Sequence, residues 1–119
     1  MLDTNMILRF LLKDNVSMAF KTAEHIENDN VIITVEVIAE VVYVLLKVYS
    51  LEREKISEVV INFVELVHCH EHDEVVLALA KFEKSNLDFV NCMLYAYHKL
   101  NGVEIATFDK QLIKILSIE

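Results

Sequence analysis

The sequence predicts an α/β fold, a three-layer α/β/α domain in which helices cover both faces of a small parallel sheet. Short apolar runs of strand length alternate along the chain with longer segments of helical period. The length of 119 residues suits one ordinary domain, and an apolar content of 55% is ample for one core. With one Gly, no Pro and no internal repeat, the chain offers no linker. We therefore expect residues 1–119 to form a single domain.

Four apolar runs are expected to be strands, over residues 1–5, 31–33, 66–69 and 104–107. The first and the last both lead into an aspartate, Asp3 and Asp109, with small polar residues beside it. Ligands of open parallel sheets bind beyond the carboxyl ends of the strands. If these two strands are neighbours, the two carboxylates meet at one place, and a bound cation is expected to relieve their repulsion.

The remaining segments have helical periodicity, and several begin or end with a capping residue. Thr34 and Asp73 are expected to cap helices at the amino end, and Asn101-Gly102 to end one at the carboxyl end. Helices are expected over residues 6–12, 16–27, 34–49, 52–65, 73–83, 87–100 and from 109 onward.

The formal charge of −8, from 19 acidic and 11 basic residues, argues against broad electrostatic capture of nucleic acid. A local basic rim is still open if the two ends of the chain lie side by side, and ordinary solvated side chains are the equally weighted alternative. The residues of this rim would be Arg9, Lys13, Lys21, Lys110 and Lys114.

The chain offers no segment for a membrane, because its densest apolar stretch, 41–46, is far shorter than the roughly 20 residues a bilayer requires. Asp3 and Arg9 interrupt the apolar core that a secretory signal would need. Cys69 and Cys92 lie among apolar neighbours, which predicts buried thiols in a reducing compartment. We therefore expect a cytoplasmic protein.

Each candidate acid has an ordinary structural explanation as well. Asp3 and Asp109 each precede a helix, where an aspartate is commonly the N-cap. Asp88 falls in a Ser85-x-x-Asp88 pattern that matches a capping box. Glu40 belongs to a polar stripe on an otherwise apolar helix, where it is either solvated or paired with a positive group.

Taken together, four short motifs resemble those of PIN-domain ribonucleases of the VapC toxin type. Leu2-Asp3-Thr4-Asn5 resembles the opening motif of that family, and Ile38-Ala39-Glu40-Val41-Val42 resembles its helix glutamate segment. Leu87-Asp88-Phe89-Val90-Asn91 resembles its third acidic motif, and Thr107-Phe108-Asp109 its last. The resemblance runs through essentially the whole chain, and the order and separations of the four motifs make it specific.

This resemblance implies a metal-dependent endoribonuclease, a hydrolase that uses Mg2+ or Mn2+ to cut RNA. The implied metal-binding and catalytic residues are Asp3, Glu40, Asp88, Asn91 and Asp109. Thr107 and Asn5 are expected to orient these carboxylates. The resemblance also implies a homodimer, and inhibition by a VapB-like antitoxin as the partner in a toxin-antitoxin system.

One departure from the family pattern falls within the implied site. The family most consistently has aspartate at the position that matches Asn91. Asparagine retains a carbonyl oxygen but lacks the charge that attracts a cation, while Asp88, three residues earlier on the same helix face, is a partial substitute. We expect weaker metal affinity and slow or absent cleavage, so a catalytically inactive PIN-like binding protein is the alternative.

Two further interpretations remain open. His68-Cys69-His70-Glu71-His72 would suit Zn2+, but strand alternation turns Cys69 away from the histidines, so a solvated strand end or partner contact is favoured. A phosphoacceptor receiver domain has similar length but needs an aspartate at the end of its middle strand. No aspartate occurs between Asp29 and Asp73.

Overall fold

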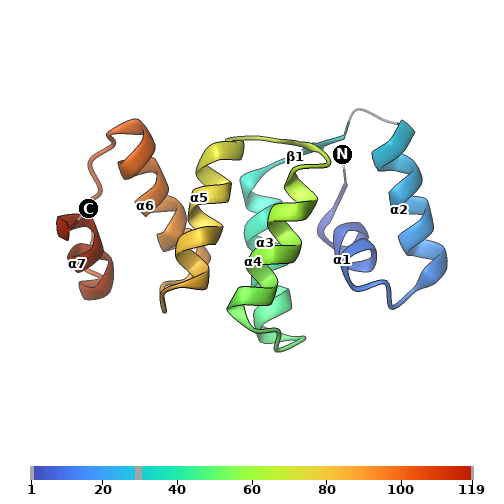
Figure 1. Ribbon diagram of the computed structural model, residues 1–119, viewed down its shortest axis with the longest axis horizontal. Coiled ribbons are helices and arrows are strands. Elements are labelled where there is room, and N and C mark those ends of the chain that lie inside the picture. Colours follow the sequence, from blue (N-terminus) through green and yellow to red (C-terminus); the bar gives the residue numbers. More distant parts are fainter. Residues whose placement is uncertain (1, 29–30, 119) are drawn as a thin grey trace.

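The structure, a computed structural model, describes residues 2–28 and 31–118. It is a helix-rich α/β fold with a small parallel sheet, which confirms the predicted fold class. In chain order the elements are α1 (Thr4–Leu12), α2 (Val16–Asn28), β1 (Ile32–Ile33), α3 (Val35–Lys47), α4 (Arg53–Val64), β2 (His68–Cys69), α5 (His72–Glu83), α6 (Phe89–Asn101) and α7 (Lys110–Ile118). The molecule measures 46 × 29 × 18 Å, and Figure 1 shows α1 and α2 at one end of its long axis and α7 at the other.

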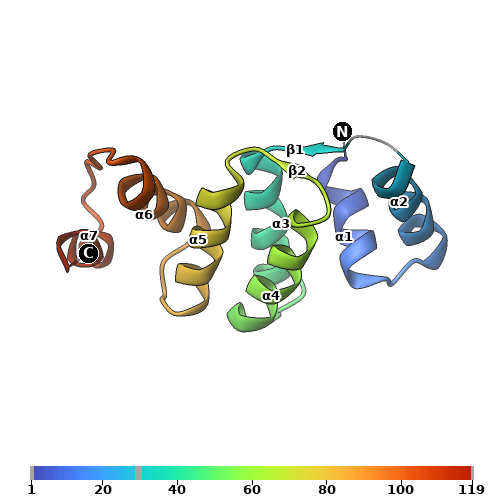
Figure 2. The ribbon, with the colours of Figure 1, turned by 45° about the horizontal axis from the view of Figure 1, so that its top comes forward.

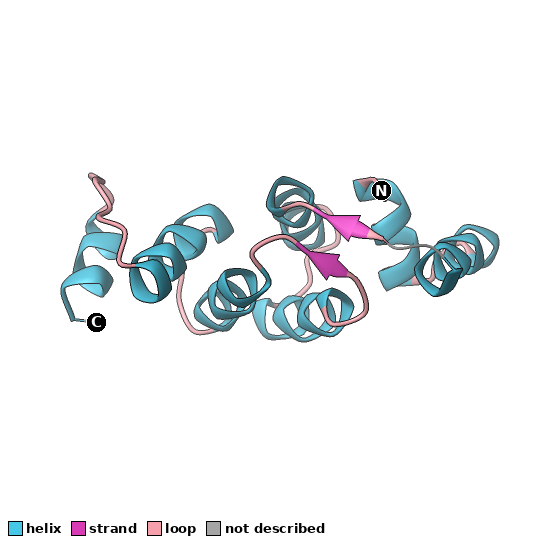
Figure 3. Cartoon of the chain, turned by 90° about the horizontal axis from the view of Figure 1, so that it is seen from above, coloured by secondary structure: helices cyan, strands magenta, loops and turns pink. Residues whose placement is uncertain are grey.

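The sheet consists of β1 and β2, which run parallel with Ile32 opposite His68 (Figure 3). The backbone N–H of His68 donates to the carbonyl of Val31, and that of His70 donates to the carbonyl of Ile33, both at 2.9 Å. Ile33 is completely buried beneath the surrounding helices. These strands correspond to the second and third predicted ones, which the structure confirms with shorter bounds.

The first and last predicted strands are not formed in the described residues. Because Asp3 caps α1 and the helix begins at Thr4, only Leu2 and Asp3 remain extended in the opening run, and Met1 lies outside the described residues. Residues 102–109 contain neither helix nor strand. They lead to α7, which lies at the opposite end of the molecule from α1 (Figures 1 and 2). The backbone groups of a sheet strand need a neighbour to pair with, and these two runs lie too far apart to pair with each other.

Most helix ends follow local capping chemistry. The Thr34 hydroxyl accepts a hydrogen bond from the Val37 N–H at 3.4 Å, and Gly102 ends α6 with φ +68°, as predicted. The predicted cap at Asp73 is wrong, because α5 begins at His72 and Glu71 occupies the N-cap position. Glu71 adopts a left-handed backbone conformation with φ +56°, which turns the chain from β2 into the helix before Asp73 is reached.

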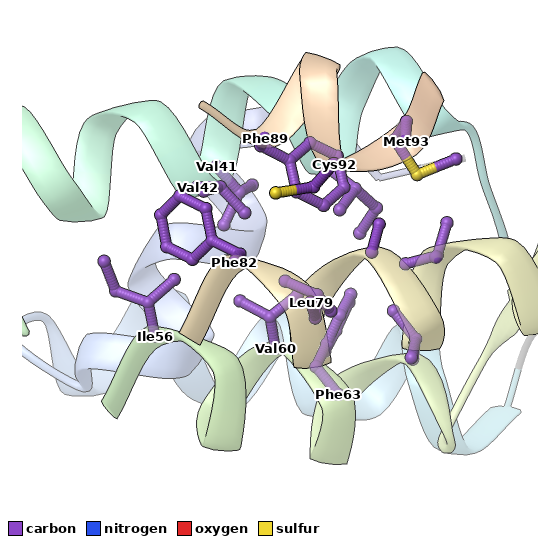
Figure 4. Packing of buried hydrophobic residues seen from close by; sticks show 14 of the residues in the cluster. Val41, Val42, Ile56, Val60, Phe63, Leu79, Phe82, Phe89, Cys92 and Met93 are labelled. Carbon is purple, nitrogen blue, oxygen red and sulfur yellow. The ribbon is translucent and has the colours of Figure 1, made fainter. Parts of the chain in front are cut away.

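The apolar core lies chiefly between α3, α4, α5 and α6 (Figure 4), and α3 contributes Val41 and Val42. Val60 and Phe63 on α4 face Leu79 and Phe82 on α5, and Cys92 on α6 is completely buried above them. Each such side chain contributes about 1.5–3 kcal/mol of burial free energy. These helices therefore form one packed body, and the loop that joins α5 to α6 is attached to it through the buried side chain of Leu87.

Both cysteines are free thiols. Cys92 is buried, as predicted, whereas Cys69 is only half-buried. Burial raises the pKa of each thiol to about 11, so both are protonated at neutral pH.

Within residues 2–28 and 31–118, none of the helices combines the length and the apolar character that crossing a bilayer would require.

Candidate functional site

Asp3 lies at the beginning of α1 and acts as its N-cap. Its Oδ1 atom accepts a hydrogen bond from the Met6 N–H at 2.9 Å, and its backbone is extended, with φ −88° and ψ 172°. The carboxylate is exposed, as is the neighbouring Asn5. Asp3 therefore has the structural role of a helix N-cap, and its carboxylate remains accessible to solvent.

Asp88 has the same role at the beginning of α6. Its Oδ1 atom accepts a hydrogen bond from the Asn91 N–H at 2.8 Å. Asn91 itself lies one helical turn further along and is half-buried. The Ser85-x-x-Asp88 capping box is not formed, because Asp88 is itself the N-cap and the Ser85 hydroxyl instead accepts from the Leu87 N–H at 3.3 Å.

A long-range contact that the sequence did not indicate holds the loop before Asp88. The Nη1 atom of Arg53, at the beginning of α4, donates to the carbonyls of Phe82, Ser85 and Leu87 at 3.0, 2.8 and 2.7 Å. The same guanidinium lies 4.1 Å from the centroid of the Phe82 ring. Arg53 thus binds carbonyl groups at the end of α5 and in the loop that follows, and these bonds position the backbone that leads to Asp88.

Asp109 is the third aspartate that acts as a local cap, here for α7. Its Oδ1 atom accepts a hydrogen bond from the Leu112 N–H at 2.8 Å, and its own N–H donates to the Thr107 hydroxyl at 3.0 Å. The Thr107 oxygen therefore binds backbone, so its expected role of orienting a carboxylate has no counterpart in these hydrogen bonds. The side chain of Phe108, between the two, is fully exposed.

Glu40 lies on the exposed face of α3. The predicted polar stripe on this helix is confirmed, since Glu36, Glu40, Tyr43 and Lys47 are all exposed. Water solvates the Glu40 carboxylate, so the helix does not require a positive partner for it. The solvated alternative is the one the structure supports for this residue.

The structure does not bring the candidate acids together. Asp3 precedes α1 and Asp109 precedes α7, and these helices lie at opposite ends of the molecule in Figures 1, 2 and 3. The expectation that the two aspartates end adjacent strands is therefore wrong, because residues 2–5 and 102–109 form no strand. Over the described ranges, no three His, Cys, Asp or Glu side chains are arranged to hold a metal ion. The acids in this arrangement do not fit a divalent cation centre, and we derive no chemical step through one.

The carboxyl ends of the two strands that do form open instead onto a small pocket of about 150 Å3. Thr34 follows β1 and Glu71 follows β2, and both line the pocket together with Glu36 and Tyr97. The Tyr97 hydroxyl donates to the Glu71 carboxylate. Burial and this bond raise the Tyr97 pKa to about 12, so the phenol keeps its proton. Sequence reasoning missed this group because the bond joins residues 26 positions apart.

The histidine cluster is arranged for ion pairing. His72 Nε2 lies 2.9 Å from a Glu65 oxygen, and His72 Nδ1 lies 3.1 Å from an Asp73 oxygen. These hydrogen bonds, the one to Asp73 first, raise the His72 pKa and favour the doubly protonated ring, which cannot bind a metal. Burial raises the pKa of the Cys69 thiol to about 11, and among the described residues these side chains are not grouped to hold a metal ion. The cluster therefore supports a strand end rather than a zinc site.

Comparison with known proteins gives one match. A model of the PIN domain family matches residues 1–116, which include all four acidic motifs. Proteins with this domain are generally nucleases, hydrolases that act on RNA or DNA and use divalent metal ions. Searches of curated proteins and of solved structures find no match to this chain.

Proposed function

The chain belongs to the PIN-domain family, and from this premise we propose that it is a metal-dependent endoribonuclease that hydrolyses RNA phosphodiester bonds, of the VapC toxin type. The observation that supports the proposal most is the extent of the family match, residues 1–116. All four acidic motifs lie inside it, in the order that the family resemblance requires. Single aspartates at helix starts would not carry the proposal, since each is also an N-cap.

The residues proposed for the reaction are Asp3, Glu40, Asp88, Asn91 and Asp109. Their oxygen atoms are the ligand type that Mg2+ and Mn2+ prefer, and such an ion would supply positive charge for the phosphodiester. The described arrangement does not gather these oxygens, so the proposal assigns residues and no geometry. If Asp3→Ala and Asp109→Ala each abolish cleavage, Asp3 and Asp109 act in one catalytic centre. The chain would then have to reach a second arrangement that unites them.

Asn91 offers the sharpest test. The change Asn91→Asp restores a negative charge one turn into α6 beside Asp88, where it would increase the attraction for a cation. We expect cleavage of a fluorogenic RNA at saturating Mn2+ to rise at least about tenfold, equivalent to about 1.4 kcal/mol in the barrier. The matched control is Asn62→Asp, the same change at an exposed position on α4. It should leave the rate unchanged.

A rate for Asn91→Asp that equals the rate of the unmodified chain would remove the argument for a metal role at position 91. EDTA provides the second control, because metal-dependent hydrolysis must stop when the ion is chelated. RNA loss that persists in EDTA would instead count as background and would contradict the enzyme proposal.

The second candidate function is a PIN-like binding protein without turnover. Asn91 and the separation of Asp3 from Asp109 favour it, and it would retain a homodimer contact and a VapB-like antitoxin contact. Large apolar side chains that could serve these contacts are exposed at both ends of the molecule: Val16 and Phe20 on α2 are 80% and 65% exposed, and Phe108 is 100% exposed. For either function we place the protein in the cytoplasm, where free thiols such as Cys69 and Cys92 are maintained.

A further inference from the structure

A cleft of about 610 Å3 is lined by the first residue of α4, by the carboxyl end of α5 with the residues that follow it, and by helix α7. Among the residues that the structure describes, the lining has four positive side chains and one negative side chain: Arg53, Lys81, Lys84 and Lys114 against Glu83. The cleft therefore has an excess of positive charge in a chain whose formal charge is −8. This cleft shares only Lys114 with the basic rim that the sequence left open, and that rim would have needed the two ends of the chain side by side.

The charges come from three separate elements, so local helix chemistry does not explain them together. Basic residues are common at helix carboxyl ends, which accounts for Lys81 and Lys84 at the end of α5. Lys114 belongs to α7, and Arg53 to the beginning of α4. Tertiary packing is what places these four cations around one hollow.

One of the four positive side chains that line the cleft, that of Arg53, has a fixed position. The guanidinium of Arg53 is fixed by three carbonyl oxygens and by the Phe82 ring. Carbonyl groups have no net charge, so these hydrogen bonds do not neutralise the Arg53 guanidinium. Lys84, at the carboxyl end of α5, and Lys114, on α7, both line the cleft and are exposed, so their side chains are able to adjust to a bound anion.

The rest of the lining suits a strand with alternating phosphates and sugars. Ser85, Asn86 and Gln111 provide polar groups, and Ile115 and Ile118 provide apolar surface. Single-stranded nucleic acid is held by basic grooves that follow its backbone. Two of the proposed catalytic residues are close in sequence to the walls, since Asn86 precedes Asp88 by two positions and Gln111 follows Asp109 by two.

We propose that the cleft between α5 and α7 binds the sugar-phosphate backbone of single-stranded RNA. The identity of the nucleic acid as RNA rests on the proposed function, whereas the position and sign of the charge come from the structure. Binding here would let an otherwise acidic protein hold a polyanion beside the Asp88 loop.

The test is a binding measurement in EDTA, so that cleavage plays no part. Fluorescence anisotropy would follow a labelled single-stranded RNA oligonucleotide against the full chain and the double variant Lys84→Glu with Lys114→Glu. We expect the variant to bind at least about tenfold more weakly. The slope of log affinity against log salt should fall in magnitude by about 1.4, because each lost phosphate contact on a single strand contributes about 0.7.

The matched control is Lys21→Glu with Lys55→Glu, which changes the total charge by the same amount. Lys21 lies on α2 and Lys55 on α4, both are exposed, and neither lines the cleft. This control should bind RNA within about twofold of the unmodified chain. Circular dichroism and thermal melting of both variants would verify that each is folded.

Equal loss of affinity in the two double variants would overturn the proposal, as would absence of RNA binding by the unmodified chain. Polyglutamate that competes as well as RNA would also overturn it, in favour of an acidic protein surface as the occupant. The outcome is separable from that of the proposed function. A chain that binds RNA through the cleft but never cleaves it would refute the enzyme alone, and a chain that cleaves RNA without the cleft lysines would refute the cleft alone.

Discussion

Two loops of this protein end in the same kind of helix cap but differ in the long-range contacts that hold them to the rest of the molecule. The first joins α5 to α6 and ends in Asp88, and the second joins α6 to α7 and ends in Asp109. Each aspartate accepts a backbone hydrogen bond at 2.8 Å from the residue three positions later. As capping sites the two are equivalent, because an N-cap depends only on residues within one helical turn.

The loops differ in what holds them to the rest of the molecule. Arg53 binds three carbonyls in and beside the first loop, and Leu87 next to Asp88 is buried. In the second loop, the ring of His98 donates to the Val103 carbonyl at 3.0 Å, while Phe108 next to Asp109 is fully exposed. A cap therefore orients a carboxylate on its own helix, whereas long-range contacts decide where that helix lies in the molecule.

The largest expected difference comes from identical truncations in the two regions. Leu79 on α5 and Leu112 on α7 are both completely buried. Leu79→Ala should lower the free energy of unfolding by about 2–5 kcal/mol, because the cavity lies inside the main apolar core. Leu112→Ala should release α7 locally and lower the stability of the main body by less than about 1 kcal/mol.

Urea unfolding followed by circular dichroism would measure both values, and hydrogen exchange would report protection of the α7 amides. Equal losses of unfolding free energy in one cooperative transition would contradict the proposed difference in support between α5 and α7. In that case α7 would be as much a part of the cooperative core as α5.

Arg53 is the residue on which the support of the first loop depends. Arg53→Met keeps much of the side-chain length but leaves the carbonyls of Phe82, Ser85 and Leu87 without their charged donor. We expect a loss of about 2–3 kcal/mol in the free energy of unfolding. Arg53→Lys is the matched control for charge, and it should recover only part of the loss because one ammonium lacks the planar geometry of the guanidinium. Full recovery with lysine in urea titrations would mean that charge alone supports the loop.

The smallest effect is expected from the caps themselves. Asp88→Ala removes a cap from a helix that the core holds, so it should reduce the global free energy of unfolding by about 1 kcal/mol. Asp109→Ala removes the same bond from α7, and its effect should appear as faster hydrogen exchange in residues 110–113 with little change in Tm. Equal shifts of Tm in both variants would contradict the difference in support described above.

The sequence was sufficient for features with local causes. Thr34 and Gly102 mark helix ends where the structure has them, and the stripe that includes Glu40 is on the exposed face of α3. The two central strands are also where their apolar runs predicted. Cap chemistry and hydrophobic period depend on neighbours within a few residues, so they can be derived without knowing the tertiary arrangement.

The candidate site could be predicted only as a set of residues. The motifs around Asp3, Glu40, Asp88 and Asp109 identify a PIN domain, and the family match includes them all. Their convergence was inferred from strands that would pair in a sheet. That inference failed because the capping tendency of Asp3 starts α1 at once and because residues 102–109 find no strand edge beside them.

By itself, then, the sequence determined the α/β class, the order of the helices, the family and the acids worth mutating. Only the tertiary structure decided that Arg53 supports the Asp88 loop, that Glu71 meets Tyr97, and that the cations of α4, α5 and α7 surround one cleft. The physical reason is the sequence separation between the residues that make these contacts. Hydrogen bonds between residues about 30 positions apart leave no periodic or local trace in the chain, and they exist only once packing has brought the helices together.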